Sequence, residues 1–281
     1  MTSLPQLFSD IPPDELIKFL LAETGQDKNE KVESKPILSI LKLKHITLDV
    51  AAIPSEALDL PPNDPLRALL YYPEKVIGTD YLLPSDRTKF SVFHEIAHYV
   101  LPEHQQSLFL CSKSDMSQRT GIILEKQANQ FAADLMFHAD LFTRMAHEMP
   151  ICAKTIKELA IKFEASFEST ARRLIEKNIR PCLLIVYEKK LPVRQADKDT
   201  EPSWDVKYPI SSTSFPFYLP ADPMNHVVVK LGSEQFRDIA DSVLGESEYG
   251  LPNGKQIRFS DEYFTNHFNV FRIMIPQQKG D

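Results

Sequence analysis

The segment FSVFHEIAHYVL contains two histidines and a glutamate whose types and spacing could hold and use a metal ion. If the segment is helical, His94 and His98 lie four residues apart on one face, and both imidazoles can reach one cation. Glu95 would then flank the metal, where its carboxylate can take a proton from a zinc-bound water. The pattern predicts a hydrolytic zinc site. The alternative is a pair of structural histidines with hydrogen-bonded neighbours and a solvated Glu95.

A catalytic zinc ion needs a third protein ligand and an open fourth position for water. Glu125, within LEKQANQFAADLM, is the candidate on the next long helix. It shares a helix face with Ala128 and Ala132, whose small side chains would let this helix approach the first one closely. From spacing alone, an ordinary surface ion pair of Glu125 with Lys126 or Arg119 is an equal alternative.

Several other residues could assist such a site. Asn129 is predicted to orient the ligand carboxylate or a nearby backbone group, although an exposed helix amide would look the same. His104 could approach the metal or a substrate and His138 follows the second helix, but ordinary surface or capping roles are favoured for both. Tyr72, Tyr99 and His104 are candidate oxyanion donors that the sequence does not separate. The histidines without a partner at ligand spacing are His45, His147, His226 and His267.

The elements that must position these residues can be predicted from periodicity and breakers. A helix is expected over residues 87–101, capped by Ser85 or Asp86 and ended by Pro102, and a second one over 118–137. Upstream, helices are expected at 13–23 and 37–43, and strands in HITLDV, RALLYY and KVIGTDYLL. The last of these runs could offer an open edge to an extended peptide substrate. The alternative is an internal strand with both edges occupied.

The second half of the chain has a different sequence pattern. Residues 153–180 predict two short helices broken near Ser166, and beyond Pro181 strand-like runs alternate with loops. We place a domain boundary near residue 180. The predicted strands are CLLIVYEKK, HVVVKLG and VFRIMI, and the predicted helix is SEQFRDIADSVL.

Composition restricts the partners and the compartment. The 281 residues are 43% hydrophobic and carry a net charge of -7, which indicates a folded chain and disfavours wholesale nucleic-acid binding. Seven Lys or Arg against four Glu over residues 153–180 make DNA contact conceivable, but packing of their apolar residues on the preceding domain is favoured. The three cysteines are far apart, as in reduced proteins. An acidic N-terminus without a long apolar run predicts a cytoplasmic protein with no membrane span.

The run RTKFSVFHEIAHYVL followed by EKQANQFAADLM resembles the ImmA/IrrE-type zinc peptidase family. The resemblance implies a zincin-like α+β domain with His94, His98 and Glu125 as zinc ligands and Glu95 as the catalytic base. The family run usually ends in Met-Pro, whereas this chain has Met136 followed by Phe137, and no ligand is affected. The matching motif residues are Arg87, Phe90, His94, Glu95, His98, Glu125, Ala128, Asn129, Phe131 and Ala132.

The order of the remaining parts resembles the longer family members related to the radiation-response regulator of Deinococcus. This resemblance implies a zinc peptidase domain with an N-terminal helical arm at 1–148, a helix-turn-helix-like segment at 149–180 and an α+β GAF-like domain at 181–281. It also implies cleavage of a helix-turn-helix repressor that induces stress-response or mobile-element genes, and it leaves room for a small-molecule ligand of the last domain. The alternatives are a binding module with a degenerate metal site and a zinc hydrolase of small substrates.

Overall fold

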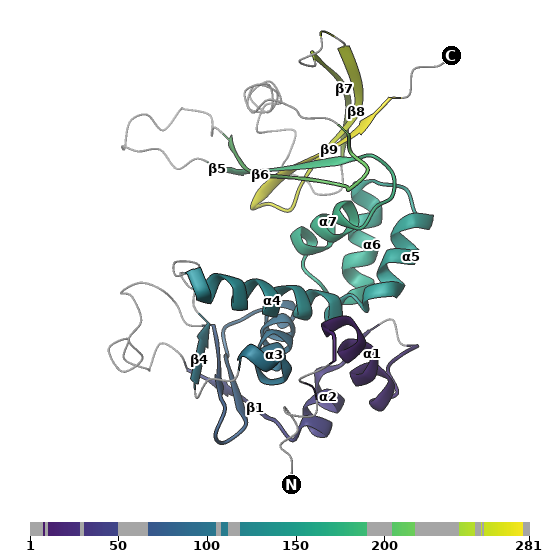
Figure 1. The fold of residues 1–281 in the computed structure, drawn as a ribbon. Helices are drawn as coiled ribbons and strands as arrows, with labels where there is room; N and C mark the ends of the chain where they lie inside the picture. The colour runs from purple at the N-terminus through teal and green to yellow at the C-terminus, as the bar shows by residue number, and fades with distance from the viewer. Residues whose placement is uncertain are drawn as a thin grey trace, which may run out of the picture. The chain divides into compact units, whose positions relative to one another are not determined.

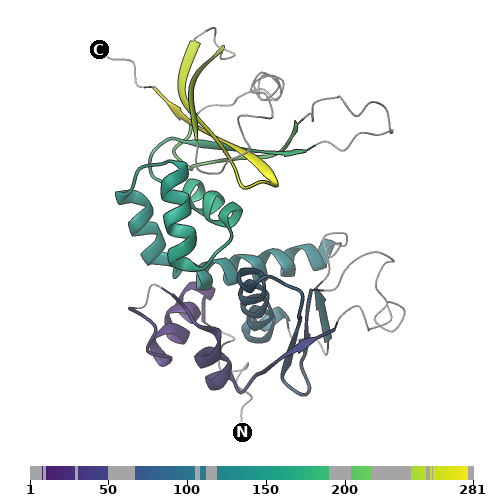
Figure 2. The ribbon, with the colours of Figure 1, turned by 180° about the vertical axis from the view of Figure 1, so that it is seen from behind.

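The computed structural model confirms the predicted α+β class. Two compact units are formed, one by residues 1–142 with 162–166 and the other by 143–161 with 167–281. Figures 1 and 2 show the elements of each unit from opposite sides. The predicted three-part division into domains stays a prediction. The described residues are 8, 11–28, 31–49, 67–104, 108–111, 119–189, 204–216, 242–250, 254 and 256–277.

The first unit combines a four-stranded sheet with helices that match the predicted ones. Its elements are α1 (Pro13–Glu23), α2 (Ser34–Leu41), β1 (Lys44–Leu48), β2 (Ala68–Tyr71), β3 (Val76–Asp80), α3 (Ser85–Val100), the 3-10 turn η4 (Pro102–His104), β4 (Leu108–Cys111) and α4 (Arg119–Met136). The strand order is β1-β3-β2-β4, with β1 parallel to β3 and the other pairs antiparallel. The sequence did not predict β4.

The prediction that KVIGTDYLL offers an open edge is wrong. The strand within it, β3, pairs with β1 on one side and β2 on the other. Its middle residues are buried, and a Cβ at Gly78 would lie 2.5 Å from Leu48 Cδ1. A larger residue at position 78 would therefore require the end of the Leu48 side chain on β1 to shift. Among the described strands, β1 and β4 form the edges of this sheet.

Helix α3 occupies the predicted range but begins differently. It starts at Ser85, its N-cap is Pro84, and no side chain caps it, so the predicted capping by Ser85 or Asp86 is wrong. Pro84 has a φ of -55°, and its fixed backbone sets the entry into the helix without a capping hydrogen bond. The helix ends at Leu101 because Pro102 has no N–H to continue the ladder.

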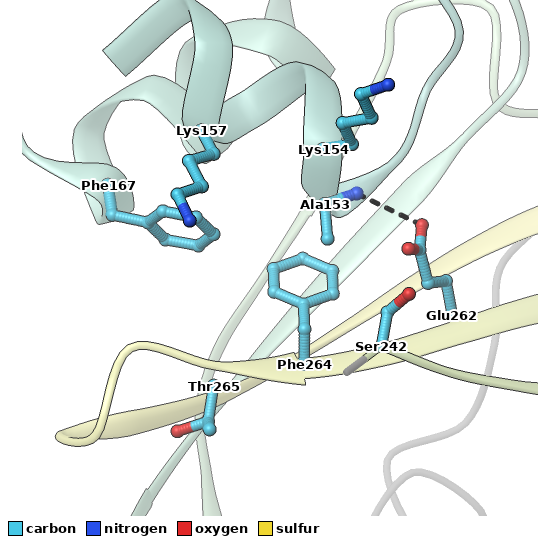
Figure 3. Close-up of a pocket in the computed structure, with 8 residues that line it drawn as sticks. All are labelled: Ala153, Lys154, Lys157, Phe167, Ser242, Glu262, Phe264 and Thr265. Carbon is cyan, nitrogen blue, oxygen red and sulfur yellow. Dashed lines mark hydrogen bonds between the residues drawn. The ribbon is translucent and has the colours of Figure 1, made fainter. Parts of the chain in front are cut away.

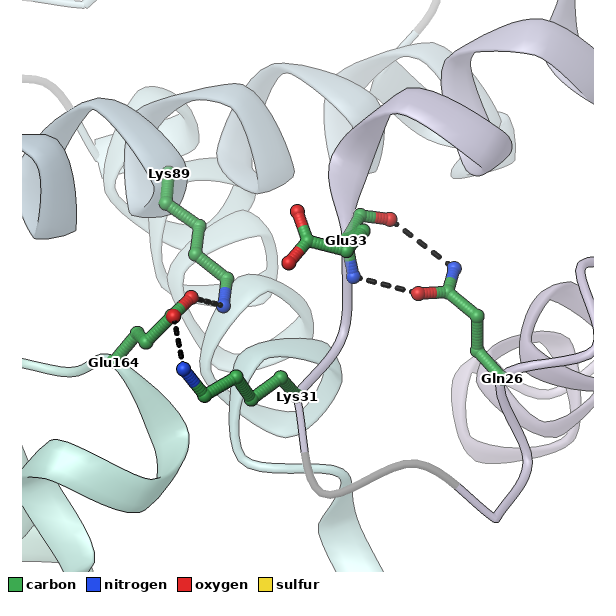
Figure 4. Close-up of polar contacts among 5 residues, drawn as sticks. All are labelled: Gln26, Lys31, Glu33, Lys89 and Glu164. Atoms are coloured by element: carbon green, nitrogen blue, oxygen red, sulfur yellow. Dashed lines mark hydrogen bonds and ion pairs between the residues drawn. The ribbon is translucent and has the colours of Figure 1, made fainter.

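A turn between α6 (Ala153–Phe163) and α7 (Phe167–Glu176) belongs to the first unit. There Glu164, which has a φ of 53°, forms ion pairs with Lys31 at 2.5 Å and with Lys89 of α3 at 3.1 Å (Figure 4). The two helices and the intervening break near Ser166 were predicted. Helix α5 (Ala139–Glu148), which precedes α6, was not.

The second unit contains a five-stranded antiparallel sheet of order β6-β5-β9-β8-β7. Its strands are β5 (Leu183–Lys189), β6 (Trp204–Ser211), β7 (Val243–Gly250), β8 (Gln256–Thr265) and β9 (Asn269–Pro276). The predicted strands CLLIVYEKK and VFRIMI are confirmed as β5 and β9. HVVVKLG and most of SEQFRDIADSVL lie outside the described residues. The last two residues of that predicted helix, Val243 and Leu244, instead begin β7, so the prediction is wrong there.

Helix α7 packs on β5 and β6, with the Phe167 ring 5.7 Å from that of Phe264 and 5.4 Å from that of Phe271. Its Glu168 accepts hydrogen bonds from Lys207 at 2.9 Å, from Asn269 at 2.8 Å and from the Tyr208 hydroxyl. The other face of the sheet carries a buried core of Leu183, Ile185, Tyr187, Tyr249, Phe259, Tyr263, Val270 and Met274.

This second core contains a buried ion pair. Arg272 of β9 is fully buried and donates to Asp261 Oδ2 at 2.9 Å, to Ser247 Oγ at 2.8 Å and to the Tyr249 hydroxyl at 2.9 Å. Its guanidinium also lies 5.2 Å from the centre of the Tyr263 ring, a cation–π distance. Burial lowers the pKa of Arg272, but the hydrogen bond to Asp261 and the charge of that carboxylate outweigh it and raise the pKa, so the pair stays charged.

The second unit also contains a cavity of about 290 Å³. Figure 3 shows Glu262 beside the first turn of α6, where its carboxylate accepts the Ala153 N–H at 3.1 Å. The residues that line the cavity are Ala153, Lys154, Lys157, Phe167, Ser242, Glu262, Phe264 and Thr265.

Candidate metal centre

Helix α3 buries the three residues of the His-Glu-x-x-His pattern. His94 is 6% exposed, and Glu95 and His98 are completely buried. The helix is held by an apolar side that includes Phe93 and Ala97, both fully buried. An interior helix turn therefore presents two imidazoles and one carboxylate away from bulk water, although polar groups are costly to bury unless they have partners.

Helix α4 brings Glu125 to this turn. Ala128 and Ala132 are fully buried in α4, which packs against α3. The burial of these two small residues is consistent with the predicted close approach of the two helices. The Glu125 side chain is 19% exposed and its oxygens reach both histidines, which is the placement expected of a third ligand.

The donor atoms of the three side chains converge. His94 Nε2 and His98 Nε2 lie 3.0 Å apart, and the Glu125 oxygens lie 3.1 and 3.2 Å from them. Tetrahedral zinc with bonds of about 2.0 to 2.1 Å would separate its ligand atoms by about 3.3 Å. Two imidazoles and one carboxylate at these distances fit a zinc ion that keeps a fourth position for water. Among the described residues, this is the one group of His, Cys, Asp or Glu with such convergence.

The protonation of the cluster also favours a cation. Burial lowers the pKa of His94, but hydrogen bonding to Glu125 and the negative charge of Glu95 outweigh it, and the net pKa is raised. Burial lowers the pKa of His98 to about 4, and the hydrogen bond to Glu125 only partly offsets this shift. The positive charge that His94 can carry lowers the pKa of His98 further, since their Nε2 atoms lie 3.0 Å apart.

Glu125 completes this balance. Burial raises its pKa, but the contacts of the carboxylate with His94 and His98, and the positive charge that these imidazoles can carry, bring the pKa down to about 2. At neutral pH the cluster is therefore one carboxylate and two imidazoles that carry at most one positive charge between them, that is, one proton beyond their neutral forms. A divalent cation that displaced this proton would satisfy all three donors at once.

His104 lies on the opposite side of His98 from this cluster. It is buried, with its Nδ1 3.0 Å from His98 Nδ1 and its Nε2 2.9 Å from Gln127 Oε1. The sequence named His104 as a residue that could approach the metal or a substrate, but favoured an ordinary surface or capping role. It is instead a buried neighbour of His98, and the sequence missed Gln127.

Asn129, Tyr99 and Tyr72 were also predicted to assist the site. Asn129 contributes a hydrogen bond that raises the pKa of His94, after the larger effects of burial, Glu125 and Glu95. Tyr99 is buried and packs on Tyr72 with ring centres 5.1 Å apart, and its hydroxyl forms no hydrogen bond within the described chain.

The remaining described histidines make local contacts. His45 Nε2 lies 2.8 Å from Thr79 Oγ1, and His147 Nε2 lies 2.8 Å from the Lys177 carbonyl. His138 lies 3.3 Å from the Gln26 carbonyl, in agreement with the ordinary role favoured for it. His226 lies outside the described residues.

Comparison with known proteins agrees with the site. Residues 46–175, which include both site helices, match the family model of the IrrE N-terminal-like domain. No curated protein sequence matches significantly. Among solved structures, a Mycobacterium tuberculosis transcriptional regulator is similar, with 13% sequence identity, a TM-score of 0.51 and coverage of 96% of this chain and 90% of that one. At this identity the likeness concerns the fold alone.

The resemblance to the ImmA/IrrE-type family is thus confirmed on the part of the chain that carries the motif. Within the described residues, no helix is long and apolar enough to span a lipid bilayer. Residues 46–175 form an IrrE N-terminal-like domain, and the family to which this domain belongs is one of metallopeptidases.

Proposed function

We propose that this chain is a zinc-dependent, site-specific endopeptidase. The observation that carries the proposal is the convergence of His94 Nε2, His98 Nε2 and the Glu125 carboxylate within 4.8 Å of one another. These three side chains would hold the ion. Bound zinc would act as a Lewis acid that lowers the pKa of water to about 7 and polarises a peptide carbonyl.

Glu95 is the proposed catalytic base. It follows His94 directly on α3, and its negative charge raises the pKa of the His94 ring. From there it would accept a proton from the attacking water and deliver it to the nitrogen of the departing amine. Its burial keeps competing water away from the carboxylate.

The proposed substrate is a protein in extended conformation, specifically a helix-turn-helix transcriptional repressor. Since β3 is internal, a substrate would have to pair with β1 or β4, the edges among the described strands, and we propose β4, which follows α3 and η4 in the chain. The repressor class comes from the family resemblance, in which cleavage induces stress-response or mobile-element genes. The solved relative is itself described as a transcriptional regulator, which supports a regulatory setting.

The second unit is proposed to regulate the peptidase, as a GAF-like domain that binds a small ligand or a protein. Its cavity of about 290 Å³ would accommodate a small molecule. We do not propose that α7 contacts DNA, even if α6 and α7 form a helix-turn-helix-like segment. Arg173 of α7 is 4% exposed, and Glu168 is engaged by the sheet.

A Glu95→Gln variant tests the peptidase. The purified chain and the variant would be assayed for bound zinc and for cleavage of repressors encoded near its gene. We expect one zinc per chain in both, with cleavage reduced by about 10²- to 10⁴-fold in the variant. Glu74→Gln, the same change at an exposed turn, is the control and should cleave normally. Normal cleavage by Glu95→Gln would rule out the assigned base.

The same assay separates the alternatives. A binding module with a degenerate site would hold no zinc in the unmodified chain. A zinc hydrolase of small substrates would hold zinc, cleave no repressor, and still lose its activity toward small amides or esters in Glu95→Gln.

A further inference from the structure

Hydrogen bonds connect His98 to His104 and His104 to Gln127, and neither His104 nor Gln127 belongs to the His-Glu-x-x-His pattern. Pro102 ends α3, and the single 3-10 turn η4 folds the chain back so that His104 lies under His98. The contacts run from His98 Nδ1 to His104 Nδ1 at 3.0 Å and from His104 Nε2 to Gln127 Oε1 at 2.9 Å. A loop residue thus connects a residue of α3 to a residue of α4.

The proton positions along this chain follow from chemistry. A neutral imidazole has one N–H and one acceptor nitrogen, and an amide oxygen can only accept. Gln127 Oε1 therefore requires the proton of His104 on Nε2, which leaves His104 Nδ1 as an acceptor. His98 must then donate from Nδ1, and its Nε2 carries the lone pair.

That Nε2 is the atom that faces the cluster, 3.0 Å from His94 Nε2 and 3.2 Å from Glu125. We propose that His104 and Gln127 are positioning residues that hold His98 in the Nδ1–H tautomer, so that the lone pair of Nε2 faces the metal site. The inference rests on the proposed function because it takes His98 as a metal ligand. Outer partners of this kind fix the ring orientation of a metal-bound histidine and increase its basicity.

The two histidines of the cluster differ in this respect. The Nδ1 of His94 is buried and forms no hydrogen bond with the part of the chain that the structure describes. The tautomer of His98, but not that of His94, is therefore determined by His104 and Gln127. Gln127 lies at an exposed position of α4, so it can be exchanged without disturbing the core.

The test exchanges donor and acceptor character at Gln127. A glutamate at this position would still accept from His104 Nε2, whereas a methionine removes the acceptor and a lysine places a donor there. For the full-length chain we expect Gln127→Glu to retain the zinc affinity, and Gln127→Met and Gln127→Lys to lose about 10- to 100-fold. Equal affinities of the three variants, within about twofold, would overturn the proposal.

A second pair acts on His104 itself. Asparagine can present an oxygen to His98 Nδ1, and leucine cannot, so His104→Asn should keep more zinc affinity than His104→Leu. If His104→Leu does not fold, the Gln127 series still decides. Because competitive zinc titration is the readout, the result does not depend on peptidase activity.

Nuclear magnetic resonance of histidine-labelled protein gives an independent readout. In the unmodified chain, two-bond nitrogen–proton couplings should assign the proton of His98 to Nδ1 and that of His104 to Nε2. The opposite tautomer of His98 would overturn the inference. If the unmodified chain bound no zinc, the proposed function would fail, whereas zinc binding that was insensitive to the Gln127 series would sink only the inference.

Discussion

The chain buries charge in two places, and the two are built in opposite ways. In the second unit, Arg272 and Asp261 supply both signs, and tyrosine and serine hydroxyls accept further hydrogen bonds from the guanidinium. In the first unit, His94, His98 and Glu125 all offer lone pairs to one point. The ion-pair partners that the structure gives Glu125 are these two histidines.

This difference indicates which cluster serves the fold and which serves chemistry. A buried ion pair that contains its own counter-charge is complete when the chain folds, and losing one partner leaves an isolated charge. A cluster of acceptors has to take a proton or a cation from outside. The Arg272 cluster is therefore structural, while the Glu125 cluster is suited to bind a metal.

The largest effect should come from removing the negative charge of Glu125, which contacts both His94 and His98. Glu125→Gln keeps the size of the side chain but removes the carboxylate that bridges the two histidines. We expect zinc affinity to fall by more than the roughly 100-fold upper range for an outer partner, with loss of cleavage. Equilibrium dialysis with zinc measures this. Full zinc occupancy of the variant at micromolar zinc would contradict the comparison.

Removing one partner of the buried Arg272–Asp261 ion pair should affect stability and not metal binding. Arg272→Met leaves Asp261 buried without its partner, which costs about 3 to 5 kcal/mol. Trp204, the single tryptophan, lies against the same core and reports denaturant unfolding of this unit by fluorescence. In the double variant Arg272→Met, Asp261→Leu the loss should be smaller. Equal losses in the single and double variants would show that the buried charge is not the cause.

The sequence predicted the convergence of His94, His98 and Glu125 better than it predicted the sheets. Four-residue spacing in a helix fixes which side chains share a face, so His94 and His98 could be paired without a structure. For Glu125, spacing left two equal alternatives, and only the family resemblance favoured the ligand. The partner helix could be brought close because Ala128 and Ala132 are small, which the sequence also indicated.

Strand order and loop geometry are decided by contacts between distant residues. KVIGTDYLL has the pattern of a strand, but its inner position depends on pairing with β1 and β2, which local pattern does not encode. The place of His104 depends on one 3-10 turn after Pro102, and Gln127 gave no signal beyond its position on a helix. The Arg272 cluster could not be predicted because its members come from three strands of undetermined register.

A third kind of charged group is Glu168, whose hydrogen bonds join α7 to the sheet. The pH dependence of stability distinguishes it from the two buried clusters. Burial raises its pKa, but hydrogen bonds from Tyr208, Lys207 and Asn269 outweigh this, and the folded pKa lies below the ordinary 4.5. Its contribution to stability is therefore present above pH 4.5 and is lost as the pH falls through the lowered folded pKa. Unfolding followed by Trp204 fluorescence should show a shallower acid loss in Glu168→Gln.

The smallest effect is expected at an ion pair that water can reach. Glu164 accepts from Lys31 and Lys89, which lowers its pKa, but its side chain is 40% exposed (Figure 4). Since solvent screens such pairs, Lys89→Gln should lower the free energy of unfolding of the first unit by about 1 kcal/mol or less, and this loss should shrink in high salt. Hydrogen exchange of α3 amides measures it. A loss as large as that of Arg272→Met would show that burial is not what separates structural from dispensable charge pairs in this chain.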